Sequence, residues 1–304
     1  MTSHYEQRLQ RDLDWISELV GLVGHQLVET IQAAVQAVLT RDKQLAAETV
    51  IGDYTINRQT RELDRLCHAF VARHLPSAGH LRYVSSVLRL NIALERIGDY
   101  AATISRTAAQ ISQPPPAAVA RDIEMMTEQA KRTLTDAMMS FQARDPQLAK
   151  TTLSTAAQFA PYFDRVFEDL IKEGDQSTRP TKDLFDLLAT LNRLERVIHQ
   201  SKNLCEETLF VVTGQAKGEK TFQILFVDAQ NDGCSQVAEH FATKAFPNSG
   251  SFLSAGWAAA AEIQDDYRTF AVTVGLDLSK SWPTDLGTLK NRLDQMDLVV
   301  VIGK

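Results

Sequence analysis

Two carboxylates stand four residues apart in the segment 90–109, which reads LNIALERIGDYAATISRTAA. On a helix, Glu95 and Asp99 would project from the same face, because residues four apart lie one turn apart. Steps of three and four back from Glu95 meet a series of apolar residues, namely Ile92, Leu88, Val84 and Leu81. This spacing predicts that the two acids interrupt the apolar stripe that the helix buries.

Carboxylates within a packed stripe cost several kcal/mol unless a basic partner, a water-filled opening or a cation compensates them. Of these three forms of compensation, two adjacent acids favour a cation. The alternative is an ordinary pair of acids four residues apart at the solvated edge of an amphipathic helix. The position of the acids on the stripe favours the cation.

A second pair of oxygen-bearing side chains, Asp53 and Asn57, is also spaced by four residues, on the preceding predicted helix. In a helical bundle this pair could face Glu95 and Asp99. Four oxygen ligands completed by water suit a hard or borderline cation such as iron, manganese or magnesium better than a structural zinc. The spacing does not choose among these metals.

The elements that must position these side chains are long helices. From Leu9 to Asn203 apolar residues recur at intervals of three and four, and proline is confined to a few joints. The joints are Arg41-Asp42, residues 76–79, residues 114–116, Asp145-Pro146 and residues 173–180. They divide the region into six predicted helices of about thirty residues, each roughly 45 Å long. Short joints make neighbouring helices antiparallel.

The helical region repeats itself at an interval of about one hundred residues. The segment Arg41–Ala46, RDKQLA, returns as Arg144–Ala149, RDPQLA, and Leu94–Arg96 returns as Leu194–Arg196. Two matches in the same order predict a duplicated three-helix unit.

The second unit lacks most of the oxygen ligands of the first. The replacements are His199 for Asp99, Ile198 for Gly98, Ala156 for Asp53 and Ala160 for Asn57. Glu195 and His199 could still offer a carboxylate and an imidazole to a metal. A simple pair on the helix surface explains them equally well.

Composition and charge exclude several classes of protein. A formal charge of -6 over 304 residues provides no basic field for nucleic acid or anionic lipid. The N-terminus carries charges where a signal peptide needs an apolar core. Cys67, Cys205 and Cys234 are scattered and form no CxxC pair, which agrees with a reducing compartment. We expect a cytoplasmic protein without a membrane span.

The helical region resembles the PhoU family of phosphate-uptake regulators across residues 9–214. The resemblance is carried by residues 38–57, VLTRDKQLAAETVIGDYTIN, and by residues 73–104, which contain the LERIGD motif. It implies two tandem three-helix bundles, residues 1–112 and 113–216, that hold metal clusters, often of iron. The family's metal-binding positions correspond here to Glu95, Asp99, Asp53 and Asn57, and in the second bundle to Glu195, with His199 in the place of the aspartate.

The same resemblance implies a function in phosphate homeostasis. PhoU-like proteins are regulators rather than enzymes, and they are thought to connect the ATPase of the phosphate transporter with the histidine kinase that senses phosphate. We therefore expect a metal-binding adaptor that regulates phosphate uptake and the phosphate-starvation response.

The pattern of apolar residues changes after a polar linker at residues 215–219. Phe222–Val227 is an apolar run rich in β-formers, residues 235–246 have a helical pattern, and Asp297–Ile302 is a second apolar run. Alternating strands and helices predict a small α/β domain with a parallel sheet, residues 217–304. The expected fold class is therefore an all-α region followed by a small parallel-sheet domain.

The run FVDAQNDGCSQVAEHF, residues 226–241, resembles the low-molecular-weight tyrosine phosphatase and arsenate reductase family. That family's loop needs a cysteine nucleophile and an arginine. Here Asp228 stands in the place of the cysteine and Cys234 in the place of the arginine. Asn231 and Ser235 match the residues that organise such a loop. Asp228 lacks a thiolate's nucleophilicity and would repel a phosphate, at a cost of about 4 kcal/mol for two charges about 4 Å apart. The resemblance therefore implies a degenerate, catalytically dead pseudophosphatase domain.

Other functions remain open from the sequence. The main alternative is an enzyme, namely a metal-dependent or cysteine-dependent phosphatase or an arsenate reductase. A ferritin-like di-iron oxidase would need an ExxH motif in each half, and a coiled coil would need long heptads. A strand at the edge of a small sheet would need cover, from a helical bundle or from a second copy in a homodimer.

Overall fold

The computed structural model describes residues 4–176, 179–215 and 221–303. The chain divides into two compact units, Met1–Lys217 and Gly218–Lys304. The sequence places a boundary between residues 216 and 217, which lie outside the described residues, so this boundary stays a prediction. Apart from Gln215, the predicted linker lies outside the described residues.

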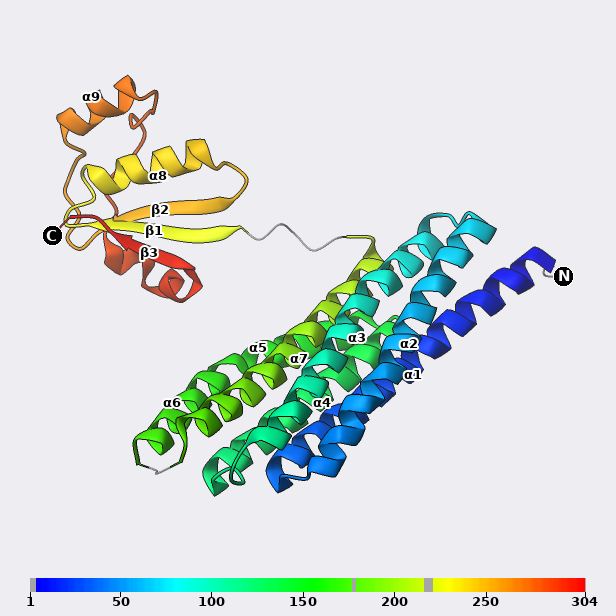
Figure 1. Ribbon diagram of the computed structural model, residues 1–304. Coiled ribbons are helices and arrows are strands. Elements are labelled where there is room, and N and C mark those ends of the chain that lie inside the picture. Colours follow the sequence, from blue (N-terminus) through cyan, green and yellow to red (C-terminus); the bar gives the residue numbers. More distant parts are fainter. Residues whose placement is uncertain (1–3, 177–178, 216–220, 304) are drawn as a thin grey trace. The chain divides into compact units, whose positions relative to one another are not determined.

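The first unit consists of long helices that lie side by side (Figure 1). They are α1 (His4–Thr40), α2 (Lys43–His74), α3 (Ala78–Gln110), α4 (Ala117–Ala143), α5 (Pro146–Gln158), α6 (Ala160–Gln176) and α7 (Thr181–Thr213). Helices α1, α2 and α3 pack on one another, and α7 packs on both α3 and α4. A single hydrophobic core runs through all of these helices, with Leu27, Leu63, Leu94, Leu134 and Leu194 fully buried. The division of this unit at residue 112 into two domains stays a prediction.

The two matched segments of the repeat form the same joint. Arg41 and Arg144 adopt left-handed conformations, with φ of 55° and 51°. Each is followed by an aspartate that caps the next helix. Asp42 accepts hydrogen bonds from the backbone N–H groups two and three residues on, and Asp145 does the same. The repeat in the sequence therefore reflects a repeated helix–joint–helix geometry.

The shared cap leads to a stability prediction. Replacing Asp42 by alanine should lower the free energy of unfolding by about 1 kcal/mol, because two N–H groups at the start of α2 lose their acceptor. Asp42→Asn retains an acceptor and should cost much less. Urea unfolding followed by circular dichroism measures both values, and equal losses in the two variants would contradict the capping role.

The middle helix of the second repeat differs from the prediction of one continuous helix. The chain forms α5 and α6 in its place, with the break at Phe159. Pro161 accounts for the break, because proline cannot donate a backbone hydrogen bond and its ring clashes with the preceding helical turn.

The second unit is a small parallel sheet with helices. Its elements are β1 (Phe222–Asp228), α8 (Cys234–Ala245), β2 (Gly250–Gly256), α9 (Asp265–Thr273), the 3-10 helix η1 (Leu286–Gln295) and β3 (Leu298–Val301). The strand order is β2-β1-β3, and both pairings are parallel. Leu225, Val227 and Ala255 form a small core beneath η1. The predicted parallel-sheet unit is therefore present, with β2 as a strand that we did not predict.

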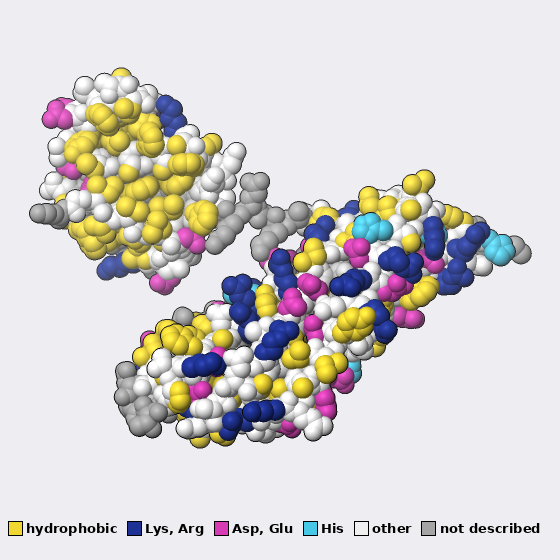
Figure 2. Space-filling model, viewed as in Figure 1, with side chains coloured by type: hydrophobic (Ala, Val, Ile, Leu, Met, Phe, Trp, Pro, Cys, Tyr) yellow, Lys and Arg dark blue, Asp and Glu magenta, His cyan; other side chains and the backbone are white. Residues whose placement is uncertain are grey.

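Apolar side chains remain exposed on both units. On the second unit they gather over the face seen in Figure 2, and the edge strand β3 is exposed at Leu298, Val299 and Val301. On the helical unit, basic and acidic side chains are interspersed over the visible face (Figure 2). Within the described residues, no helix combines the length and the apolar character that a membrane crossing requires. The homodimer stays a prediction.

Candidate functional site

Helices α2 and α3 bring together the four residues that the sequence singles out, which we call the acidic cluster: Asp53, Asn57, Glu95 and Asp99. Asn57 Nδ2 donates a hydrogen bond of 2.8 Å to Asp53 Oδ2. Asp53 lies against α3 at Gly98, where a Cβ atom would stand 3.1 Å from Asp53 Oδ1. The Asp53 carboxylate therefore packs onto the turn of α3 that separates Glu95 from Asp99.

The close approach of the two helices depends on Gly98. A side chain there would meet both Asp53 and Ile56 of α2, the latter at 3.3 Å from the added Cβ. In the second repeat the corresponding position is Ile198, which is buried, and the position of Asp53 is the buried Ala156. A large residue on one helix and a small one on the other thus replace the glycine and aspartate of the first repeat.

The carboxylates of the acidic cluster repel one another. Burial, followed by the negative charge of Asp99, raises the pKa of Asp53, against the opposing effects of the Asn57 hydrogen bond and the Arg106 charge. Burial and the charges of Asp99 and Asp53 also raise the pKa of Glu95. The nearby arginines therefore do not compensate the cluster fully, and a cation would be favoured there.

These shifts predict how the stability of the metal-free protein depends on pH. A carboxyl whose pKa is raised binds more protons in the folded state than in the unfolded chain. Its contribution to the stability of the protein should therefore fall as pH rises from the unfolded pKa through the raised folded pKa. The Glu95→Gln variant should lose less stability between about pH 4 and about pH 7. Urea unfolding of chelator-treated protein at several pH values tests this. The expectation fails if the free energy of unfolding changes with pH equally in the wild type and in Glu95→Gln.

One atom of the cluster indicates a missing partner. Asp53 Oδ1 is buried and makes no hydrogen bond. A cation would satisfy it, and the carboxylates with the Asn57 amide oxygen are suitable ligands for a hard metal. Within the described residues, however, no three His, Cys, Asp or Glu side chains are arranged as metal ligands. The residue types fit a cation, but side chains would have to turn to coordinate it.

The acids do not interrupt the buried stripe of α3, and this part of the sequence prediction is wrong. Ile92 and Leu81 are 54% and 46% exposed, Glu95 is half-buried and Asp99 is exposed. The buried face includes Leu90, Leu94 and Ile97. The cluster therefore lies at the edge of the helix, where it is open to solvent and to partners.

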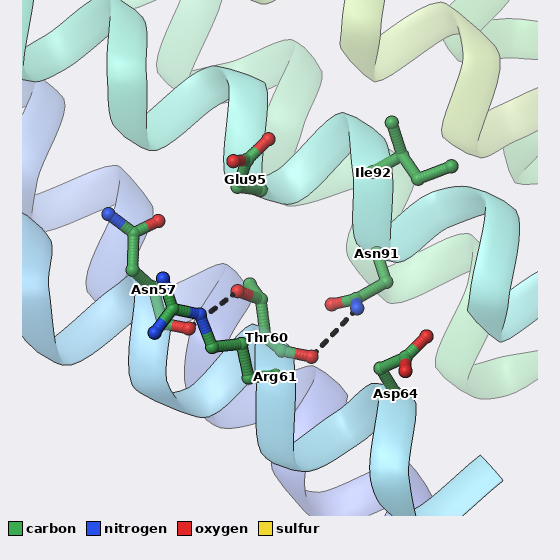
Figure 3. A pocket seen from close by; sticks show the side chains of 7 residues that line it. All are labelled: Asn57, Thr60, Arg61, Asp64, Asn91, Ile92 and Glu95. Carbon is green, nitrogen blue, oxygen red and sulfur yellow. Dashed lines mark hydrogen bonds between the residues drawn. The ribbon is translucent and has the colours of Figure 1, made fainter. Parts of the chain in front are cut away.

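A pocket of about 340 Å³ adjoins the cluster (Figure 3). Its lining residues are Asn57, Thr60, Arg61, Asp64, Asn91, Ile92 and Glu95. Asn91 Nδ2 donates a buried hydrogen bond of 2.8 Å to the Thr60 carbonyl oxygen and so ties α3 to α2. We did not predict Asn91, although a polar residue one turn before Glu95 on an apolar helix face was a usable signal.

The second repeat provides fewer candidate metal ligands than the first. His199 Nε2 lies 3.9 Å from Glu195 Oε1, and the His199 side chain is 58% exposed. Ala156 supplies no ligand opposite them. The alternative of a simple surface pair describes this contact, and metal binding by Glu195 and His199 stays a prediction.

In the second unit, the loop between β1 and α8 is built around Asp228. Its carboxylate accepts hydrogen bonds from the backbone N–H groups of Gln230, Asn231 and Ser235 and from the Ser235 hydroxyl. Asn231 Nδ2 donates to Ser235 Oγ at 2.8 Å, so these two residues organise the loop. Cys234 is exposed, and its Sγ lies 3.2 Å from the Tyr267 hydroxyl.

The other two cysteines are unsuited to nucleophilic chemistry. Cys67 and Cys205 are buried in the helical unit. Burial raises the pKa of each thiol to about 12, so neither forms a thiolate at neutral pH.

The chain is similar to known proteins over part of its length. Residues 20–108 match the family model of the PhoU domain. A phosphate-specific transport system accessory protein PhoU homolog from Pseudomonas putida is 27% identical over 221 residues, which cover 70% of this chain and 84% of that protein.

Two crystal structures share the fold. PhoU from Pseudomonas aeruginosa has a TM-score of 0.64 and 23% identity, and the match covers 68% of this chain and 99% of that one. The phosphate transport system regulatory protein PhoU from Streptococcus pneumoniae has a TM-score of 0.63 and 22% identity, with 70% and 99% covered. Residues 20–108 therefore match the PhoU domain family, and the chain is similar to PhoU accessory proteins over about 70% of its length.

Proposed function

We propose that this protein is a PhoU-like accessory protein that regulates phosphate uptake and phosphate-starvation signalling. One observation carries the proposal: the PhoU domain match at residues 20–108 includes α2 and most of α3, the helices that assemble the acidic cluster. The relative from Pseudomonas putida is named as an accessory protein of the phosphate-specific transport system.

The acidic cluster is the proposed metal site, with iron as the expected metal. Asp53, Asn57, Glu95 and Asp99 would hold it. The buried, unpaired Asp53 Oδ1 and the raised pKa values of Asp53 and Glu95 support this assignment. The metal would supply positive charge between α2 and α3 and so cancel the repulsion between the acids.

The proposed partners are the ATPase of a phosphate transporter and a phosphate-sensing histidine kinase, which the protein meets in the cytoplasm as an adaptor. The second unit acts without catalysis, as a degenerate phosphatase-like domain. Asp228 supports the lack of catalysis, because a carboxylate that accepts hydrogen bonds from its own loop is neither free nor soft enough to attack phosphorus.

Gene deletion in the native host tests the regulatory role. Cells without the protein should express starvation-induced alkaline phosphatase in phosphate-rich medium, and a plasmid copy of the wild-type gene should restore repression. A Glu95→Ala copy should restore it poorly, whereas a Glu195→Ala copy, changed at the matching position of the second repeat, should restore it fully. Deletion that leaves both phosphate uptake and the reporter unchanged would refute the proposal.

A further inference from the structure

The pocket beside the acidic cluster contains a buried oxygen that lacks a partner. Asn91 lines this pocket and is only 8% exposed. Its Nδ2 donates to the Thr60 carbonyl oxygen, and since a carbonyl oxygen can only accept, this contact fixes which end of the amide is the oxygen. Asn91 Oδ1 is buried and, among the described residues, has no hydrogen-bond partner. Figure 3 shows this side chain reaching from α3 into the space between the two helices, where the N–H group of a ligand would satisfy the oxygen.

Other acceptors line the same pocket. Asn57 Nδ2 donates to Asp53 Oδ2, which leaves Asn57 Oδ1 as an acceptor by the same reasoning. Glu95 and Asp64 add two carboxylates to the lining. Acceptors and negative charge favour a ligand with positively charged N–H donors, and an ammonium group supplies three of them.

Arg61 adds a positive charge to the lining. It is exposed and extends from α2, opposite Glu95 of α3 (Figure 3). A simple ammonium ion would be repelled by the guanidinium, whereas a carboxylate on the same ligand would pair with it. The lining therefore matches a zwitterion better than a simple cation or anion.

The second repeat shows that the fold does not require a polar lining at this place. The residues at four matching positions are apolar: Ala160 for Asn57, Phe163 for Thr60, Phe167 for Asp64 and Leu191 for Asn91. Leu191 is fully buried in the core. An unpaired amide in the place of a core leucine lowers stability, and proteins accept such a loss at binding sites.

We infer that the pocket between α2 and α3 binds a small amino acid, with its ammonium group on Asn91 Oδ1 and its carboxylate on Arg61. The volume of the pocket, about 340 Å³, lies in the range of pockets that hold small ligands. This inference goes beyond the proposed function, because it requires neither a bound metal nor a transport partner.

Calorimetric titration of the full-length protein tests the inference. The probes are the amino carboxylates glycine, β-alanine and γ-aminobutyrate, with butylamine and butyrate as ligands that carry one charge each. At least one amino carboxylate should bind at least about tenfold more tightly than butylamine and butyrate, because only a zwitterion makes both contacts.

Variants at the two ends of the pocket locate the site. Asn91→Leu installs the residue of the second repeat, so it should fold with a thermal midpoint no lower than that of the wild type, yet bind the amino carboxylate at least about tenfold more weakly. Arg61→Gln should also weaken binding by about tenfold. Arg58→Gln removes an exposed charge of the same helix outside the lining and should bind like the wild type.

The titration is repeated after treatment with a chelator, which separates this site from the proposed metal site. Binding that persists without metal supports the inference even if the acidic cluster holds no cation. The inference is overturned if no amino carboxylate binds better than butylamine and butyrate, if binding disappears with the metal, or if either folded variant, Asn91→Leu or Arg61→Gln, binds as tightly as the wild type. Should Asn91→Leu not fold, Arg61→Gln decides, since it changes an exposed residue.

Discussion

Protein purified without a metal-affinity tag should retain metal, and Glu95→Ala should lose most of it. Glu95 is half-buried, and its pKa is raised by burial and by the charges of Asp99 and Asp53. Removing it takes away one ligand and part of the negative charge that attracts a cation, so the affinity should fall by about ten- to a hundredfold or more. Elemental analysis by plasma mass spectrometry gives the metal content per chain.

The repeat provides a matched control for this experiment. Glu195→Ala makes the same chemical change at the corresponding position of the second half, where Glu195 Oε1 lies 3.9 Å from Nε2 of the exposed His199. If Glu195 and His199 form only a surface pair, its metal content should match the wild type, whereas a loss in Glu195→Ala would assign metal to the second repeat. Equal losses in the two variants, or full retention in Glu95→Ala, would remove the basis for a metal site between α2 and α3.

Gly98 offers a separate, steric test of the same site. Gly98→Ile installs the residue that stands at the matching position of the second repeat. Because even a Cβ atom there would lie 3.1 Å from Asp53 Oδ1, the larger side chain must displace the carboxylate. The variant should lose metal although every proposed ligand is still present.

The sequence sufficed to find the acidic cluster but not its degree of burial. Helix α3 carries two adjacent apolar stripes with the same period. Leu81, Val84, Leu88 and Ile92 lie on one, and Tyr83, Val87, Leu90, Leu94 and Ile97 lie on the other. The periodicity of the sequence cannot tell which of two adjacent stripes is the more buried, because packing against α1, α2 and α7 decides this. The structure buries the second stripe throughout, whereas the first stripe is buried at Val84, partly buried at Leu88 and exposed at Leu81 and Ile92, so the acids lie at the edge.

Strand β2 shows why the rest of the fold was harder to predict. The segment GSFLSAG has glycine at both ends and no β-branched residue, so its local preference for a strand is weak. It is a strand because it pairs with β1 along its whole length, from Phe222↔Gly250 to Asp228↔Gly256. Its final glycine is also required by the close approach of the Asn231 loop. Both reasons are tertiary contacts that a local pattern does not contain.

The second large effect is expected at Asp183, whose role local sequence patterns also did not reveal. Asp183 lies in the first turn of α7 and is 2% exposed. It accepts hydrogen bonds from the backbone N–H of Ser112, at 3.0 and 3.1 Å, and from the Ser112 hydroxyl at 2.6 Å. Arg179 Nη1 lies 3.5 Å from it and also donates to the Gln113 carbonyl oxygen. The pair therefore fastens the start of α7 to the joint between α3 and α4.

Asp183→Ala should lower the free energy of unfolding by about 3 kcal/mol, because it removes a buried carboxylate that lies 3.5 Å from Arg179 Nη1 and accepts from the Ser112 hydroxyl and backbone N–H. Asp186→Ala is the control one turn along α7, where the carboxylate pairs with the exposed Lys182. That surface pair should contribute less than about 1 kcal/mol. Urea unfolding of both variants gives the comparison, and similar losses would show that Asp183 is no more than a surface acid.

The pH dependence separates the charge of Asp183 from its shape. Burial opposes ionisation of this carboxyl, but the hydrogen bonds from Ser112 and Gln113 and the charge of Arg179 outweigh it and lower its pKa. A lowered pKa contributes stability above the unfolded value of 3.8, and this contribution is lost as pH falls through the folded value. Asp183→Asn keeps the size of the side chain and should lack this loss in acid. If the variant instead retained the wild-type acid slope, the charge at the joint would not be what holds α7 in place.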